Sequence, residues 1–128
     1  MTRAEVRRER ERLERAFRFV QRRLGWTLDI ALERNDDISL LCVRPSERGV
    51  EDPVCFIVEF NPDTVSALSL AEIRSSAFHE LLHGKMWPFW EAATASVSAK
   101  VRDHLLKRYW EPLVYDLERS VWPWVGGG

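Results

Sequence analysis

The sequence lacks any apolar run that approaches the roughly 20 residues a membrane span needs. No apolar stretch near the amino terminus resembles the core of a signal peptide. It has two cysteines, Cys42 and Cys55, too few for a disulfide framework, and we interpret them as small apolar strand residues in a reducing compartment. Its 19 basic and 20 acidic side chains leave no charge excess typical of nucleic-acid binding. We therefore expect a cytoplasmic protein with neither a membrane segment nor a nucleic-acid partner.

The chain is long enough for one hydrophobic core and too short for two. Its 128 residues are 45% hydrophobic and 30% charged, an ordinary globular composition. The sequence predicts a single domain over residues 1–125, followed by a flexible glycine tail at 126–128.

An amphipathic helix is predicted over residues 2–24, and Gly25 ends it. Apolar residues recur at steps of three, four and seven along one stripe: Val6, Leu13, Phe17, Val20 and Leu24. The segment carries nine Arg and four Glu, a local charge of +5. Because the Glu residues are spaced to pair with Arg along the helix, a solvated face is favoured over an anion-binding surface.

Three strands are predicted after this helix, over residues 26–32, 38–43 and 54–60. Turn-forming residues join the first two at 35–37, and a looser link over 45–53 joins the second and third. Such short links favour an antiparallel meander. The third strand is apolar without alternation, which is typical of a strand covered on both faces.

Three helices are expected after the sheet, over residues 69–86, 89–109 and 112–123. Ser69 with Glu72 forms a capping-box signature, and Pro88 is expected to end the first of them. Pro112 suits the first turn of the last. The fold class is therefore α+β, with an N-terminal helix, a small and mainly antiparallel three-stranded sheet, and a helical C-terminal half.

The first of these later helices contains an HExxH motif, His79-Glu80-Leu81-Leu82-His83. Two His four residues apart lie on one helix face, where both imidazoles can bind one tetrahedral cation. Glu80 is offset by about 100°, so it can reach a metal-bound water without binding the metal. This arrangement predicts metal-assisted hydrolysis with Zn²⁺, in which Glu80 accepts the proton of the attacking water.

A third protein ligand must come from elsewhere in the chain, because two His leave the coordination incomplete. Residues 84–89 offer no donor, which excludes the metzincin extension. The candidates are Glu111, Glu118, Asp116, His104, Asp103 and Glu91. Glu111 fits best because it begins a helix whose apolar stripe would pack beside the motif, and Glu118, seven residues on, lies on nearly the same face. A carboxylate that only stabilises the helix dipole is the alternative for Glu111.

The order of elements resembles the small zincin-like metallopeptidases of bacteriophages and prokaryotes, the minimal gluzincin type. The resemblance is carried by His79-Glu80-Leu81-Leu82-His83-Gly84 and by a last helix that begins Glu111-Pro112-Leu113-Val114-Tyr115-Asp116. It covers most of the chain, although only the HExxH motif is specific. The resemblance implies a zincin-like fold with His79, His83 and Glu111 as zinc ligands and Glu80 as the catalytic base. It also implies a peptide or protein substrate and, for a phage-encoded member, the host cytoplasm.

Substrate binding is expected along a strand edge beside the motif helix, and residues 54–60 form the strand nearest to it in sequence. Tyr115 and Tyr109 are candidates for stabilising the oxyanion, although each also suits a core position, so the role stays unassigned. The main alternative function is a non-catalytic zinc-binding regulatory or protein-interaction domain. An interaction protein that binds partners through its arginine-rich helix is a third.

Overall fold

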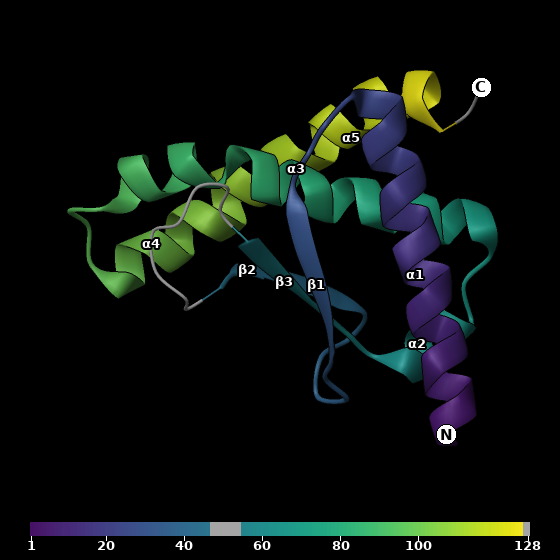
Figure 1. Cartoon of the computed structure of the whole chain (residues 1–128). Helices are drawn as coiled ribbons and strands as arrows, with labels where there is room; N and C mark the ends of the chain where they lie inside the picture. Colours follow the sequence, from purple (N-terminus) through teal and green to yellow (C-terminus); the bar gives the residue numbers. More distant parts are fainter. Residues whose placement is uncertain (47–54, 127–128) are drawn as a thin grey trace.

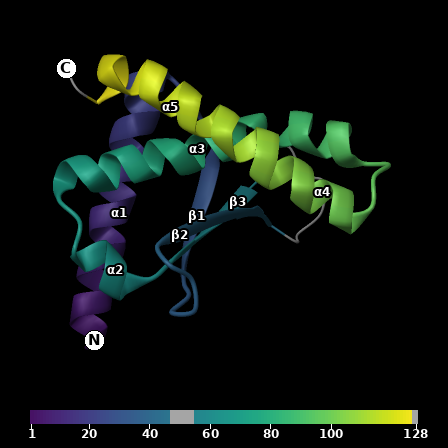
Figure 2. The same ribbon diagram turned by 180° about the vertical axis from the view of Figure 1, so that it is seen from behind.

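The computed structural model describes residues 1–46 and 55–126, and it confirms an α+β architecture. The elements in chain order are α1 (Arg3–Leu24), β1 (Asp29–Arg34), β2 (Leu41–Pro45), β3 (Cys55–Phe60), α2 (Pro62–Ser66), α3 (Leu70–Thr94), α4 (Ala99–Leu105), η1 (Leu106–Trp110) and α5 (Glu111–Val125). Helix α3 crosses the molecule above the sheet, with α1 at one end and α4 at the other (Figure 1). Seen from behind, α5 lies along α3 (Figure 2). None of the described helices is both long and apolar enough to cross a membrane.

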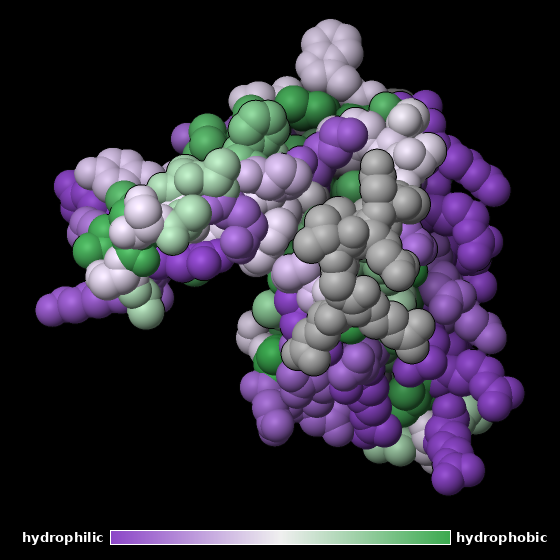
Figure 3. All heavy atoms as spheres, turned by 60° about the vertical axis from the view of Figure 1, so that its left-hand side comes forward, coloured by the Kyte–Doolittle hydropathy of each residue, from purple (hydrophilic) through white to green (hydrophobic). Residues whose placement is uncertain are grey.

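Helix α1 forms as its sequence predicts. Thr2 and Glu5 make a reciprocal capping box at its start, and Gly25 ends it with a positive φ of 69°, a backbone conformation that favours glycine. Leu13, Phe17 and Val20 are buried on the predicted stripe. Hydrophilic side chains gather over the outer face of the helix (Figure 3).

The sheet is mixed, so the predicted antiparallel meander is wrong. Its strand order is β1-β3-β2: β1 runs parallel to β3, and β2 runs antiparallel to it. The strand that the sequence places last is therefore central. It is buried on alternate residues, Phe56, Val58 and Phe60, so it is fully covered on one face rather than on both.

The link between β1 and β2 explains this topology. Residues 35–40 span two strand spacings, about 10 Å, around the end of β3. Asn61, which follows β3, holds the link in place: its backbone N–H donates to Leu40 O at 2.9 Å, and its side-chain amide donates to Ile38 O at 2.9 Å. The apolar β3 can then insert between the two strands and bury its side chains against the helices.

Helix α3 continues through Pro88 to Thr94, so the prediction that Pro88 ends it is wrong. The proline removes one backbone donor, but packing beyond it holds the helix together. Trp90 is buried, its ring centroid lies 5.1 Å from that of Trp110, and its carbonyl accepts a 2.8 Å hydrogen bond from the hydroxyl of Thr94.

The prediction of a single helix over 89–109 is also wrong, because residues 95–98 are not helical and separate α3 from α4. Ser98 caps α4, and α4 continues without a break through the π-helical turn η1 into α5. Glu111 N–H donates to Leu106 O, five residues back, which is the π-helical pattern. Pro112 follows within the helix, and Pro123 lies inside α5 rather than at its end.

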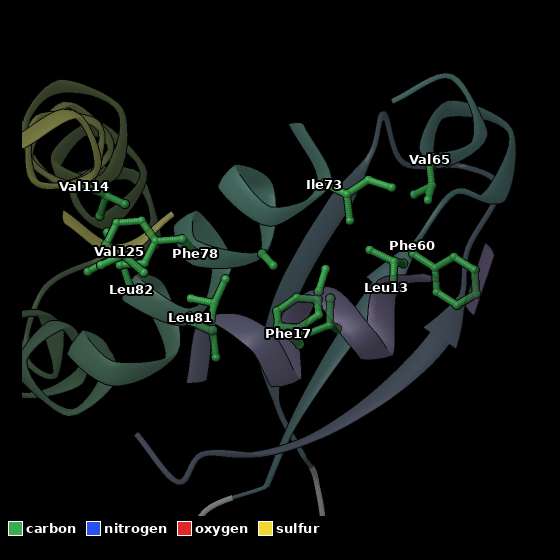
Figure 4. Close-up of a cluster of buried hydrophobic side chains, with 14 residues drawn as sticks. Leu13, Phe17, Phe60, Val65, Ile73, Phe78, Leu81, Leu82, Val114 and Val125 are labelled. Carbon is green, nitrogen blue, oxygen red and sulfur yellow. The ribbon is translucent and has the colours of Figure 1, made fainter. Parts of the chain in front are cut away.

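The hydrophobic core lies along the first half of α3, from Ile73 to Leu82 (Figure 4). Near the start of α3, Ile73 packs in a group with Leu13, Phe60 and Val65; toward its middle, Phe78 and Leu82 pack near Val114 and Val125 (Figure 4). The core therefore holds α3 between the sheet, α1 and α5. Three sequence predictions fall partly outside the described residues: most of the link over 45–53, the first residue of the third strand and the last two glycines of the tail. Gly126, the first residue of that tail, is the C-cap of α5.

Candidate metal centre

The HExxH motif lies in the middle of α3, where the core fixes its orientation. Ser69 and Glu72 cap the helix as the sequence predicts. Leu81 and Leu82, between the two His, are buried, so the opposite side of the same turns presents His79 and His83 to the cleft. The two imidazole centroids lie 4.9 Å apart, and both side chains are largely buried, with 14% and 11% of their surface exposed.

Glu111 is the carboxylate that approaches both imidazoles. Its Oε2 lies 3.8 Å from His79 Nε2, and its Oε1 lies 3.3 Å from His83 Nε2. One ligand atom from each of the three residues lies within 4.8 Å of the other two, so the group could hold a metal ion. Glu111 has helical angles (φ −61°, ψ −45°) although it precedes a proline.

Glu118 makes a different contact from the one a metal ligand would make. Its Oε2 lies 2.9 Å from His79 Nδ1, the nitrogen on the side away from Glu111, and its Oε1 accepts a 2.9 Å hydrogen bond from the hydroxyl of Ser75. A carboxylate in this position orients an imidazole ligand and raises its basicity. Ser75 lies four residues before His79 on the same helix face, so helical spacing alone could have identified it.

The other candidate ligands make their contacts with residues other than the two motif His. Three of them form ion pairs on the helical surface: Glu91 with Arg102, Asp103 with Lys107 and Asp116 with Arg119. The ring of His104 lies against Tyr109. Among the described residues, Glu111 alone completes a three-residue group with the motif His pair.

Glu80 is half-buried beside the three donors, and its environment changes its acidity. Burial raises the pKa of Glu80 to about 7, and the nearby Glu111 carboxylate adds to the shift. His79 and a hydrogen bond from the backbone of Val43 oppose it. Because the ordinary value is 4.5, this carboxyl group can exchange a proton near neutral pH.

The cleft in front of these residues has a volume of about 710 Å³. Residues 39–43 line one side of the cleft, and side chains of α3, α4, η1 and α5 line the other. The molecule is visibly hollowed between the sheet and the arm formed by α4 and the end of α3 (Figure 3). Three tryptophans, Trp87, Trp90 and Trp110, give it an apolar wall. Cys42 lies in the opposite wall, where burial and the charge of Glu80 raise the pKa of its thiol. Cysteine nucleophilic chemistry is therefore disfavoured here.

The strand edge that borders the cleft is β2, which corrects the expectation that residues 54–60 supply it. The described part of that range forms β3 (Cys55–Phe60), which is paired on both sides. Leu40 O accepts from Asn61 N, and Ser46 N donates to Cys55 O, so the even-numbered residues of β2 bond to β3. Leu41 and Val43 therefore direct their backbone groups away from β3. Val43 uses one of them to bond Glu80.

The two candidate tyrosines occupy different places. The ring of Tyr115 lies 4.8 Å from that of His79, and Tyr115 lines the cleft with half of its surface exposed. Tyr109 instead contacts Arg108 and His104.

The structure shows two further contacts of the motif that the sequence did not predict. The indole N–H of Trp110 donates a hydrogen bond to His83 Nδ1 at 3.2 Å, and the Val43 backbone bonds Glu80. Burial also lowers the pKa of His83, which favours its neutral form. The adjacency of Trp110 to Glu111 was visible in the sequence, but the π-helical turn that directs both toward His83 was not.

Comparisons with protein-family models, with curated proteins and with solved structures found no match to this chain.

Proposed function

We propose that the chain is a Zn²⁺-dependent hydrolase that cleaves peptide bonds in the cytoplasm, as its resemblance to small zincin-like metallopeptidases implies. One observation carries the proposal: the three candidate ligands meet in a cleft beside a half-buried carboxyl group, Glu80, with a pKa of about 7. A group of exposed acidic residues would not have this geometry.

The donor set is chemically suited to zinc. Two imidazoles and one carboxylate match the three protein ligands of catalytic zinc sites, whereas Ca²⁺ and Mg²⁺ prefer oxygen ligands alone. His79, His83 and Glu111 would hold the ion, and Glu118 would orient His79. When bound, Zn²⁺ supplies a Lewis acid that polarises a carbonyl and makes water more acidic.

Residues of the chain carry out the proton transfer, the substrate binding and the stabilisation of the transition state. Glu80 accepts a proton from the attacking water and returns it to the leaving amine, and the Val43 backbone holds its carboxylate in place. The outward backbone groups of Leu41 and the outward carbonyl of Val43 pair with an extended peptide. We assign to Tyr115, whose ring lies 4.8 Å from that of His79, the hydrogen bond to the oxygen that becomes negative in the transition state.

The test combines metal analysis with peptide hydrolysis. Purified protein should contain one Zn²⁺, and His79→Ala should lose it. Glu80→Gln should keep the metal and lose at least about a hundredfold in kcat, because the general base is gone. A wild-type protein that binds Zn²⁺ but hydrolyses no member of a mixed peptide library would support a non-catalytic zinc-binding domain instead. Absence of stoichiometric Zn²⁺ would refute both functions.

A further inference from the structure

The two motif imidazoles have partners of opposite character on their Nδ1 atoms. His79 Nδ1 faces the carboxylate of Glu118 at 2.9 Å, and a carboxylate without a proton can only accept. A proton on His79 Nδ1 satisfies this contact, and Nε2, the proposed ligand atom, then faces Glu111.

His83 has the reverse arrangement. Its Nδ1 accepts a hydrogen bond from the indole N–H of Trp110 at 3.2 Å, and an indole N–H can only donate. His83 Nε2 lies 3.3 Å from the Glu111 carboxylate, which can only accept. The hydrogen bond from Trp110 requires the neutral tautomer with the proton on Nε2, and the position of the Glu111 carboxylate is compatible with that proton.

We propose that Trp110 lowers the affinity of the site for metal by holding His83 in this tautomer. The inference rests on the proposed function, since it concerns the same metal centre. A cation bound through Nε2 needs the lone pair of that atom, so the Nε2 proton must leave to solvent while Nδ1 takes one up from solvent. The new Nδ1–H then faces the Trp110 N–H, donor against donor, and the hydrogen bond is lost. Imidazole ligands usually have an acceptor in this position.

The local structure keeps Trp110 in place. Its ring packs against Trp90 with centroids 5.1 Å apart, and it ends the π-helical turn η1. The next residue is Glu111, so one turn supplies both a candidate ligand and the donor that opposes binding. Because Trp110 is held in place, loading with metal leaves its N–H facing a second donor and without its hydrogen bond to His83.

The tautomer can be observed directly in the wild-type, metal-free protein. Long-range ¹H–¹⁵N spectra of the imidazoles distinguish a protonated Nδ1 from a protonated Nε2, and the chain has only three His to assign. We expect His83 protonated on Nε2 and His79 protonated on Nδ1. A proton on Nδ1 of His83 overturns the proposal, and this experiment needs no variant to fold.

The effect on metal binding is measured by titrating Zn²⁺ against a chromogenic chelator. Trp110→Phe keeps an aromatic ring and removes the N–H, so it should bind Zn²⁺ about three- to tenfold more tightly, the value of one hydrogen bond. Trp122→Phe is the matched control, because Trp122 packs on Phe78 in the same helical region and does not line the cleft. Its affinity should equal that of the wild type.

The outcomes separate the two proposals. Equal or weaker binding by Trp110→Phe overturns the role of Trp110 and leaves the metal site standing. No Zn²⁺ binding by either the wild type or Trp110→Phe overturns the proposed function itself.

Discussion

Glu80→Gln should change how the stability of the metal-free protein depends on pH. Burial of this side chain raises its pKa from 4.5 to about 7, so the folded protein prefers the neutral carboxyl group. Between these two pH values the folded state binds more protons than the unfolded state, and its stability falls as the pH rises. The stabilisation is complete below pH 4.5 and is lost as the pH passes 7.

The magnitude follows from the size of the shift. Each pKa unit corresponds to about 1.4 kcal/mol, so a shift from 4.5 to about 7 costs about 3 kcal/mol at high pH. Glutamine cannot ionise, and its side-chain oxygen can still accept the hydrogen bond from Val43. Glu80→Gln should therefore be about 3 kcal/mol more stable than the wild type above about pH 8, and nearly equal to it at about pH 4.

The assay is urea unfolding from about pH 4 to 9 with a chelator present, which keeps the protein metal-free. Glu14→Gln is the control, because it removes the same charge from an exposed position on α1. A stability difference between Glu80→Gln and the wild type that does not change with pH would refute the reasoning. So would an equally large pH-dependent change in Glu14→Gln.

Three further predictions concern the site and its supporting helix. Glu118→Ala removes the acceptor on His79 Nδ1 and should weaken Zn²⁺ binding about 10- to 100-fold in the chelator titration, whereas unchanged affinity would exclude an orienting role. Tyr115→Phe should lower kcat for peptide hydrolysis about a hundredfold with little change in KM, and a change in KM alone would assign Tyr115 to ground-state binding. Gly84→Ala should raise the free energy of unfolding by about 0.8–1 kcal/mol, because alanine favours the helix and its methyl group meets Phe56 at an ordinary 3.7 Å; a loss of stability in calorimetry would contradict this.

The helical elements with clear local signals could be predicted from the sequence. The Thr2 and Ser69 capping boxes and the Gly25 stop each involve residues three or fewer positions from the helix end, so the sequence carries the whole interaction. The prediction that Pro88 ends the helix failed for a physical reason. A local rule ends the helix there, but the tertiary contact between Trp90 and Trp110 compensates for the lost backbone hydrogen bond.

The sheet could be predicted in content but not in order. Short apolar runs and turn residues locate three strands, yet pairing depends on which strand buries the most apolar surface between the others. Asn61 holds the 35–40 link around the end of β3, which makes β3 central and leaves β2 at the cleft. Contacts between residues more than 20 positions apart decided this order, and no local pattern contains them.

For the metal centre, too, the sequence determined some features and the tertiary structure decided the others. The sequence by itself determined that His79 and His83 share one helix face with Glu80 beside them, because an α-helix repeats every 3.6 residues. Only the tertiary structure decided that Glu111 faces the imidazoles while Glu118 bonds His79 from behind, since the π-helical turn before α5 sets the rotation of that helix. Helical spacing relates residues within one helix, whereas the approach of a second helix depends on how the two surfaces pack.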